Sequence, residues 1–326
     1  AICLRCLEKA PAQRYATAQA LADDLGRWLN DERPKEVPGP LARRARRVRR
    51  PVAIAAMVFL MFLMGTGYYL YASDRAAAKW NRQELAQGRA VTLIQESGAP
   101  RWSRWQIGKI GSQATVGPDG TYLVSTTRTV LLELVPEVPT QRYRITAQVN
   151  HQSNQLTLGE VGLYVGRRVY EAGPNQFHFF AAVAYNGVWM SRDLSAVAPA
   201  GLKLVPPSPV NHVRLAPYLQ ADETSPCPYS FGFSGVPGPP IQPLGENSGI
   251  WCNLEVIVTP EKITANWEGQ TFSMTTADLQ ERVTSELAGN HPPPATQLPA
   301  DFVPVFEPRG GVGLYVRRGS ASFRSV

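Results

Sequence analysis

Five acidic residues are the candidates for acid–base chemistry in this chain. They are Glu133, Glu160, Asp193, Glu255 and Glu268. Hydrolysis of a glycosidic bond requires two carboxyl groups that face each other across that bond. The five acids are scattered along the sequence, so each is predicted to be a solvated surface carboxylate. The sequence therefore predicts no catalytic residue.

Tryptophans are the second set of informative residues, because an exposed indole gives a sugar ring a surface on which to stack. Trp102, Trp105 and Trp189 are the candidate ligand-binding residues, and Trp251 and Trp267 could serve in the same way. The alternative is that most of them pack in a core, since tryptophan is highly buried on average. The sequence leaves open which of them, if any, faces a ligand.

Histidine and cysteine spacing predicts no metal site. The four histidines show no ligand-type spacing, and Cys3-x-x-Cys6 has no second ligand pair near it. Structural zinc sites need both pairs. Cys3 and Cys6 are therefore predicted to be reduced thiols buried in a core.

The element that must position the rest of the chain is an uncharged stretch, residues 51–72 (PVAIAAMVFLMFLMGTGYYLYA). As a helix it would be about 33 Å long, enough to cross the hydrocarbon of a bilayer. Tyr68, Tyr69 and Tyr71 lie at its far end, where amphipathic rings suit the headgroup region. We therefore predict a transmembrane helix. The alternative is a buried core helix of a soluble protein.

An arginine block precedes this stretch and predicts its orientation. Its members are Arg43, Arg44, Arg46, Arg47, Arg49 and Arg50. Such flanks stay on the cytoplasmic side and face anionic lipid, so residues 1–50 are predicted to be cytoplasmic and residues 73–326 extracytoplasmic. Residues 1–50 carry a net charge of +6, in a chain whose total is +7. The basic charge therefore belongs to the inner segment and does not predict nucleic-acid binding by the outer one.

Cys227 and Cys252 are the only cysteines of the outer segment. Oxidation is favoured outside the cytoplasm, and the two flank one stretch rich in proline and glycine. We therefore predict a disulfide between them. The alternative is two buried free thiols.

Residues 1–32 are predicted to form two short helices, the second capped by Thr17. The apolar residues of the second helix recur on one face: Leu21, Leu25, Trp28 and Leu29. So short a segment cannot bury that stripe alone. Because the chain also begins with Ala1, we expect this segment to be the trailing edge of a larger domain.

The same segment carries a family resemblance. The run Cys6–Thr17 (CLEKAPAQRYAT), with Ala20–Leu25 and Trp28-Leu29 after it, resembles the end of the C-terminal lobe of bacterial Ser/Thr protein kinases. The resemblance implies that Arg14 pairs with the glutamate that ends the kinase activation segment, and that ATP and Mg²⁺ bind in a kinase core. The motifs that phosphoryl transfer needs do not occur here. This chain is therefore predicted to bind no cofactor and to transfer no phosphate.

Two connecting segments flank the predicted membrane helix. Residues 33–50 are predicted to be a Pro- and Arg-rich linker, because Pro34, Pro38 and Pro40 break helices. Residues 73–98 are predicted to be a helical stalk. A coiled-coil homodimer seam in the stalk stays open as an alternative, although no sustained heptad occurs.

Residues 99–326 are predicted to form one all-β domain, a two-sheet sandwich of jelly-roll type. Alternating or continuous apolar residues predict strands at 143–150, 177–185, 254–258, 263–267 and 271–274. Turn residues predict hairpins at Pro118-Asp119-Gly120 and at Glu268-Gly269. The sequence VGLYV occurs at 161–165 and again at 312–316. We interpret its two copies as equivalent sheet strands whose glycines allow close packing.

The end of this domain carries a second resemblance. Gly310–Val326 (GGVGLYVRRGSASFRSV) resembles the final hairpin of concanavalin-A-like jelly rolls, in particular families described as 3-keto-disaccharide hydrolase-like, and Trp251–Gly269 matches their penultimate region. The resemblance implies the fold but does not transfer activity. The acidic run E-x-D-x-x-E of laminarinase-type jelly-roll glycosidases does not occur in this chain.

The leading interpretation is the C-terminal, non-catalytic portion of a membrane-anchored Ser/Thr protein kinase. Its predicted partners are membrane lipid, a kinase lobe in cis, and a ligand, carbohydrate among the candidates, sensed by the extracytoplasmic domain. The rival interpretation is a membrane-tethered carbohydrate-active enzyme. An acid-rich concave face on the sandwich would favour the enzyme.

Overall fold

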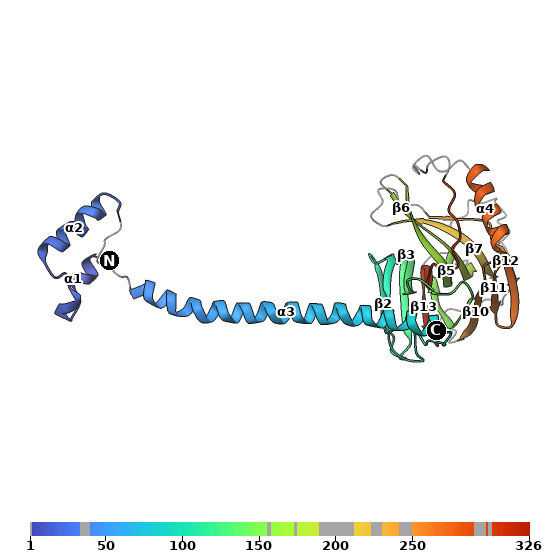
Figure 1. The fold of residues 1–326 in the computed structure, drawn as a ribbon, viewed down its shortest axis with the longest axis horizontal. Helices are drawn as coiled ribbons and strands as arrows, with labels where there is room; N and C mark the ends of the chain where they lie inside the picture. Colours follow the sequence, from blue (N-terminus) through green and yellow to red (C-terminus); the bar gives the residue numbers. More distant parts are fainter. Residues whose placement is uncertain are drawn as a thin grey trace, which may run out of the picture. The chain divides into compact units, whose positions relative to one another are not determined.

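The computed structural model describes residues 2–32, 40–154, 158–172, 175–188, 212–222, 230–240, 250–289, 298 and 302–326. The chain divides into two compact units, Ala1–Ala72 and Ser73–Val326. The first unit is helical and the second is mostly β structure, as predicted (Figure 1).

Two short helices and a 3₁₀ turn precede the long helix of the chain: α1 (Ile2–Cys6), η1 (Pro11–Gln13) and α2 (Ala18–Leu29). The Thr17 hydroxyl accepts a hydrogen bond from the Ala20 amide at 3.2 Å, which confirms the predicted cap of α2. The start of α2 is thereby fixed by one side chain, because the first amides of a helix have no partner within it.

The apolar face of α2 lies open. Leu25, Trp28 and Leu29 are 41%, 62% and 76% exposed, so the described residues provide no cover for this stripe. Cys3 and Cys6 are exposed as well, and the prediction that they are buried is wrong. The physical reason is size, since two short helices have too little surface to enclose side chains from both of them.

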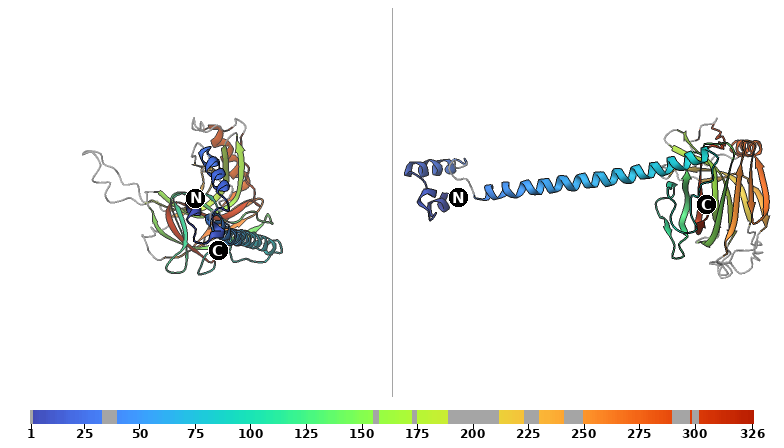
Figure 2. Two further views of the ribbon diagram at one scale, coloured as in Figure 1. Left: turned by 90° about the vertical axis from the view of Figure 1, so that its left-hand side faces the viewer. Right: turned by 60° about the horizontal axis from the view of Figure 1, so that its bottom comes forward.

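The third helix, α3 (Pro40–Ala86), is one unbroken element of 47 residues (Figures 1 and 2). The predicted linker therefore ends earlier than residue 50, because the arginine block is helical, and the helix of the predicted stalk ends at Ala86. Arginine is a good helix former, and proline is tolerated in the first turn, where its missing N–H has no partner to lose. Residues 33–39 of the predicted linker lie outside the described residues.

One part of α3, Ala56–Ala86, is long and apolar enough to cross a membrane. Its apolar side chains, among them Phe59, Leu60 and Phe62, are exposed rather than packed against the protein. This excludes the alternative of a buried core helix for the described residues. Length and composition alone are weak evidence of a membrane span, and they do not set its orientation.

Within the described residues, the β domain contains thirteen antiparallel strands in one continuous, curled sheet. The strands are β1 (Arg104–Ile107), β2 (Ser112–Val116), β3 (Tyr122–Val135), β4 (Tyr143–Asn154), β5 (Leu158–Ala172), β6 (Asn175–Val188), β7 (His212–Ala221), β8 (Ser230–Gly232), β9 (Val236–Pro240), β10 (Cys252–Val258), β11 (Lys262–Trp267), β12 (Gln270–Thr275) and β13 (Gly311–Arg324). The main path runs β12-β11-β10-β4-β13-β5-β6-β7-β8, while β3 pairs with β1, β2 and β13, and β9 pairs with β7.

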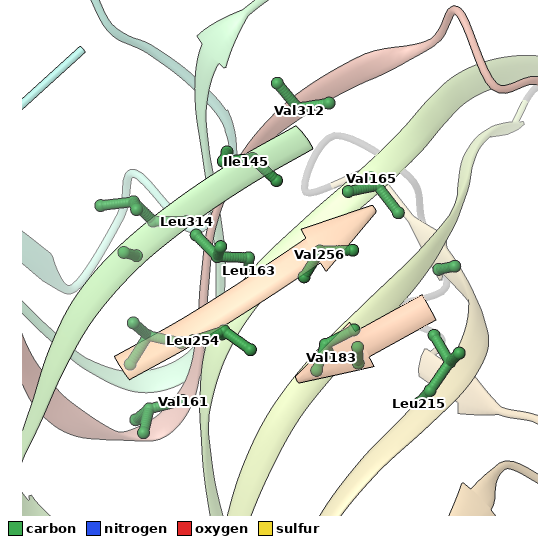
Figure 3. Close-up of a cluster of buried hydrophobic side chains, with 14 of the residues drawn as sticks. Ile145, Val161, Leu163, Val165, Val183, Leu215, Leu254, Val256, Val312 and Leu314 are labelled. Carbon is green, nitrogen blue, oxygen red and sulfur yellow. The ribbon is translucent and has the colours of Figure 1, made fainter. Parts of the chain in front are cut away.

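Strand β13 turns this sheet into two layers. Its first half pairs with β5 and its second half with β4, so the strands beyond β4 separate from those beyond β5. Figure 3 shows Leu254 and Val256 of β10 packed over Leu163 of β5 and Val183 of β6, within one buried core. The result is one curled sheet that resembles a jelly-roll sandwich. The predicted sandwich architecture is confirmed, but one continuous sheet forms both layers instead of the two separate sheets predicted.

The domain also contains a helix that the all-β prediction missed, α4 (Thr276–Gly289). The Thr275 hydroxyl accepts a hydrogen bond from the Asp278 amide at 3.0 Å, at the N-terminal end of the helix, and Leu279 and Val283 are fully buried in the core. A threonine before an acidic first turn, followed by apolar residues four apart, is a helix signal that was present in the sequence.

The two VGLYV copies are neighbours in the sheet. They pair with each other in antiparallel fashion, with Gly162 opposite Tyr315 and Gly313 opposite Tyr164. The interpretation as equivalent strands is confirmed. At both glycines a Cβ would meet the backbone of the next strand, of Val183 at Gly162 and of Leu132 at Gly313, so the predicted close packing is confirmed.

Candidate functional site

An open groove of about 380 Å³ lies on the outer face of β4, β10 and β11. Strand alternation places it there, because Leu254 and Val256 point into the core and Asn253 and Glu255 point away from it. The residues that line the groove are Thr146, Ala147, Gln148, Asn253, Leu254, Glu255, Asn266, Gly269 and Ser325.

A row of hydrogen-bonded polar side chains crosses the groove from strand to strand. Arg324 on β13 donates from Nε to Oε1 of Gln148 on β4 at 2.7 Å, and Gln148 donates from Nε2 to Oδ1 of Asn253 on β10 at 3.1 Å. The backbone N–H of Asn253 donates to Oε1 of Glu268 and extends the row to the next turn. The row is possible because Arg324 and Asn253 lie directly opposite Gln148 on its two sides.

Two features mark the ends of this row. At one end, the Arg324 guanidinium lies 4.0 Å from the centre of the Trp251 ring. At the other, Glu268 and Gly269 have φ values of 49° and 83°, and form the predicted hairpin turn between β11 and β12. Positive φ at both central positions is typical of the tight turn that suits twisted strands. The row thus runs from an aromatic ring to a turn carboxylate.

A second row lies beside the first. Glu255 on β10 is opposite Thr146 on β4 and Asn266 on β11. Its Oε1 pairs with Nε of Arg144 at 3.1 Å, and this pair is partly exposed. The groove therefore presents three side-chain amides, two hydroxyls and the carboxylate of Glu255, and the Glu268 carboxylate lies at the end of the first row. Both carboxylates already have a partner. That chemistry suits hydrogen bonding to a polar ligand better than proton transfer.

The opposite layer carries a different polar set around Glu160, which is buried. Its carboxylate accepts hydrogen bonds from Tyr315 at 2.5 Å and Tyr218 at 3.1 Å, and pairs with Arg214 at 2.7 Å and Arg317 at 3.7 Å. Burial, and then the charge of Glu160, raise the pKa of both tyrosines. Both phenols therefore stay protonated and act as donors.

A second buried carboxylate, Glu133, lies on the same face. It accepts hydrogen bonds from Arg167 at 2.7 Å and from Gln106 at 2.5 Å. Arg167 also contacts Nδ1 of His178 at 3.1 Å. Burial and the Arg167 charge lower the pKa of His178 to about 4, with Asp222 opposing them. His178 is therefore neutral at physiological pH.

Glu133 and Glu160 do not form a glycosidase pair. Glu133 is opposite Gly313 and Glu160 is opposite Arg317, four residues further along β13 and on its other side. This places them roughly 14 Å apart along the strands and 10 Å apart across them. Glycoside hydrolysis uses carboxyl groups about 5–9.5 Å apart. Both acids, which the sequence predicted to be solvated, are instead buried in ion pairs.

Comparison with protein-family models and with characterised proteins finds no match. Among solved structures, the carbohydrate-binding module CBM66 from Bacillus subtilis is similar, with 8% identity over 72% of this chain and 96% of that chain and a TM-score of 0.36. A beta-porphyranase from Bacteroides plebeius has 6% identity over 63% and 67%, and a TM-score of 0.25. The kappa-carrageenase from Pseudoalteromonas carrageenovora has 12% identity over 63% and 68%, and a TM-score of 0.24.

Likenesses at identities near 10% and TM-scores below 0.5 do not decide what this chain does. The two-layer fold rests on the strand pairing of the chain itself, and the character of the groove rests on the side chains that line it.

Of the predicted ligand-binding tryptophans, the two that the structure describes, Trp102 and Trp105, do not line the groove. Trp105 is partly buried against the core, Trp102 is half-buried, and Trp189 lies outside the described residues. Trp267, one of the further indoles, is buried in the core. Among the four of these tryptophans that the structure describes, Trp251 is the one beside the groove, through its contact with Arg324.

The remaining predicted site residues stay untested. Cys252 is buried as a free thiol, and its predicted disulfide partner, Cys227, lies outside the described residues. Arg14 donates from Nε to the Glu8 carbonyl at 2.8 Å, at an exposed position. Its pairing with a kinase glutamate stays a prediction. Asp193, one of the five candidate acids, also lies outside the described residues.

Sequence reasoning missed Gln148 and Asn253, which line the groove, and Arg324, which bonds to Gln148 beside it. The available signal was weak. Gln148 and Asn253 occupy the polar positions of two strongly alternating strands, which shows that they face outward. Nothing in the sequence pairs those strands with each other, so the row that the side chains form appears only in the fold.

Proposed function

We propose that the β domain is a carbohydrate-binding module and that the groove on β4, β10 and β11 is its ligand site. The observation that carries this proposal is the row of Arg324, Gln148, Asn253 and Glu268, with Trp251 at its end. Planar amides, carboxylates and guanidinium groups bond to sugar hydroxyls, and an indole offers an apolar surface to a sugar ring. Carbohydrate is also the ligand class named for the solved structures above, at a likeness too distant to support the proposal.

Replacing Asn253 or Gln148 by alanine is expected to weaken binding of the cognate oligosaccharide by about tenfold, the factor that corresponds to about 1.4 kcal/mol. Binding is measured by titration calorimetry on the full chain in detergent, with cellohexaose, xylohexaose, mannohexaose and oligogalacturonate as probes. Thr264→Ala, on the same outer face but outside the groove, is the control. Full affinity in both groove variants would show that the ligand binds elsewhere.

We further propose that α3 anchors the chain in a membrane with the arginine block in the cytoplasm and the β domain outside. The block on one side of the apolar stretch supports this orientation, because basic flanks are retained on the cytoplasmic side. The exposure of the apolar side chains of α3 supports contact with lipid. The block then adds attraction to anionic headgroups.

Thiol labelling tests this orientation. Cys3 and Cys6 are exposed on the inner segment, and Ser285 is exposed on α4 of the β domain. A membrane-impermeant maleimide added to right-side-out vesicles is expected to label Ser285→Cys at once, above the level of the unmodified chain, and to reach Cys3 and Cys6 only after detergent is added. Labelling of Cys3 and Cys6 in sealed vesicles, with Ser285→Cys protected, would reverse the proposed orientation.

We also propose, from the sequence resemblance alone, that the inner segment is the end of a Ser/Thr kinase lobe and that ATP and Mg²⁺ bind in the kinase core to which it belongs. The open apolar face of α2 is consistent with this, because Leu25, Trp28 and Leu29 need a covering surface. In this proposal the β domain supplies the ligand-binding half of a receptor-like kinase.

A further inference from the structure

The last three residues of the chain join the groove to the segment that follows the membrane helix. We propose that Arg324, Ser325 and Val326 form a latch through which occupancy of the groove acts on that segment, residues 93–95. This inference rests on the proposed function and adds the regulation of that site.

The groove end of the latch consists of Arg324 and Ser325. Ser325 lines the groove itself, and Arg324 is held between Gln148 and Trp251. Ser325 has a φ of 53°, a left-handed conformation that is uncommon for a residue with a side chain. Such a conformation persists only where the surroundings hold it, and such positions often occur at functional sites. A ligand in the groove therefore touches a backbone that is already under constraint.

The other end of the latch is a short set of backbone hydrogen bonds. Val326 donates to the Ile94 carbonyl at 2.9 Å, and its own carbonyl accepts from Ile94 at 3.1 Å and from Leu93 at 2.6 Å. The Ser325 amide donates to the Gln95 carbonyl at 3.3 Å. Ile94 is fully buried and Val326 is nearly so. Ser325 and Val326 are thus bonded to residues 93–95.

Residues 93–95 follow the end of α3 within a few positions, and that end is itself fixed to the β domain. Leu85 packs against the core, Asn81 is buried, and Arg82 pairs with Glu137 at 2.7 Å. A change at residues 93–95 therefore occurs close to the point where the end of α3 is attached to the β domain.

A ligand can shift a structural equilibrium only by its different affinity for the two states. The latched state presents Arg324 and Ser325 at the groove, and release of the latch would remove both. A ligand that contacts either residue therefore favours the latched state. The expected result is slower exchange of the Leu93 and Ile94 amides when the groove is filled.

Hydrogen exchange on the full chain in detergent tests the latch without a ligand. Gln148→Leu removes the partner that holds Arg324 and touches none of residues 93–95. Exchange in the segment that contains them is expected to become about fivefold faster, the factor for the loss of one hydrogen bond. Thr264→Ala is the control and should leave the exchange unchanged. If Gln148→Leu does not fold, Gln148→Asn takes its place, because it keeps the amide but is too short to reach Arg324.

The second arm adds whichever of the four oligosaccharides binds most tightly. Slower exchange at residues 93–95 in the bound wild-type chain supports the latch. Unchanged exchange despite calorimetric binding would overturn it and leave the groove as a binding site. Unchanged exchange in the Gln148 variant would overturn it as well. If none of the four probes binds, faster exchange in that variant still supports the latch, while the proposed carbohydrate ligand fails.

Discussion

Replacing Glu160 by alanine is expected to destabilise the β domain by about 3–5 kcal/mol. The carboxylate is buried and is the shared partner of Arg214, Arg317, Tyr218 and Tyr315. Without it, two guanidinium groups lie close together with no opposite charge between them, and two buried phenols lose their acceptor. The loss of stability should appear as a lower midpoint of urea unfolding at an unchanged slope. Unfolding is monitored by tryptophan fluorescence, to which the buried Trp267 contributes.

An exposed pair of the same type is the matched control for this variant. Glu261 pairs with Arg142 at 3.0 Å, with both side chains largely exposed. Glu261→Ala is expected to lower the urea midpoint far less than Glu160→Ala does, because water screens such an exposed pair and solvates the arginine that remains. Equal losses for Glu160→Ala and Glu261→Ala would contradict the assigned burial of Glu160.

The turns and the strands of the β domain were predictable because their signals are local. The predicted turn at Pro118-Asp119-Gly120 links β2 and β3, with the Asp119 carboxylate accepting a hydrogen bond from the Thr121 amide at 3.1 Å. Glu268 and Gly269 likewise form the predicted hairpin. Alternation identified the core faces of β4 and β10. Each of these features depends on residues only a few positions apart.

The burial of the acidic residues could not be predicted from local signals. From the sequence, Glu133, Glu160 and Glu255 were all predicted to be surface carboxylates. The fold buries the first two in ion pairs and places the third in the groove. Which of these happens depends on arginines far away in sequence, such as Arg317 beside Glu160, and on the register of strands that share no local signal.

The first residue of α3 and the presence of α4 were also predicted wrongly. Prolines suggested a linker up to residue 50, but the arginine block after Pro40 continues as helix. Proline interrupts a helix only where an amide or the preceding turn is needed, and at the first turn neither is lost. Helix α4 was not predicted because the segments before and after it show the patterns of strands. Leu279 and Val283 nevertheless have helical spacing.

Gly313→Val is expected to be the second large loss of stability, roughly 3 kcal/mol at the upper end of overpacking effects. A side chain at Gly313 would meet the backbone of Leu132 and Glu133 on β3, which cannot move aside as a flexible side chain would. Strand β13 pairs with β3 and also with β5, so a shift of one strand disturbs both pairings. Gly289→Ala is the control, because Gly289 has nothing within 4 Å of an added Cβ and lies at the end of α4. It should change stability by less than about 1 kcal/mol. If both variants unfold at the wild-type urea concentration, the close approach of β13 to β3 is wrong.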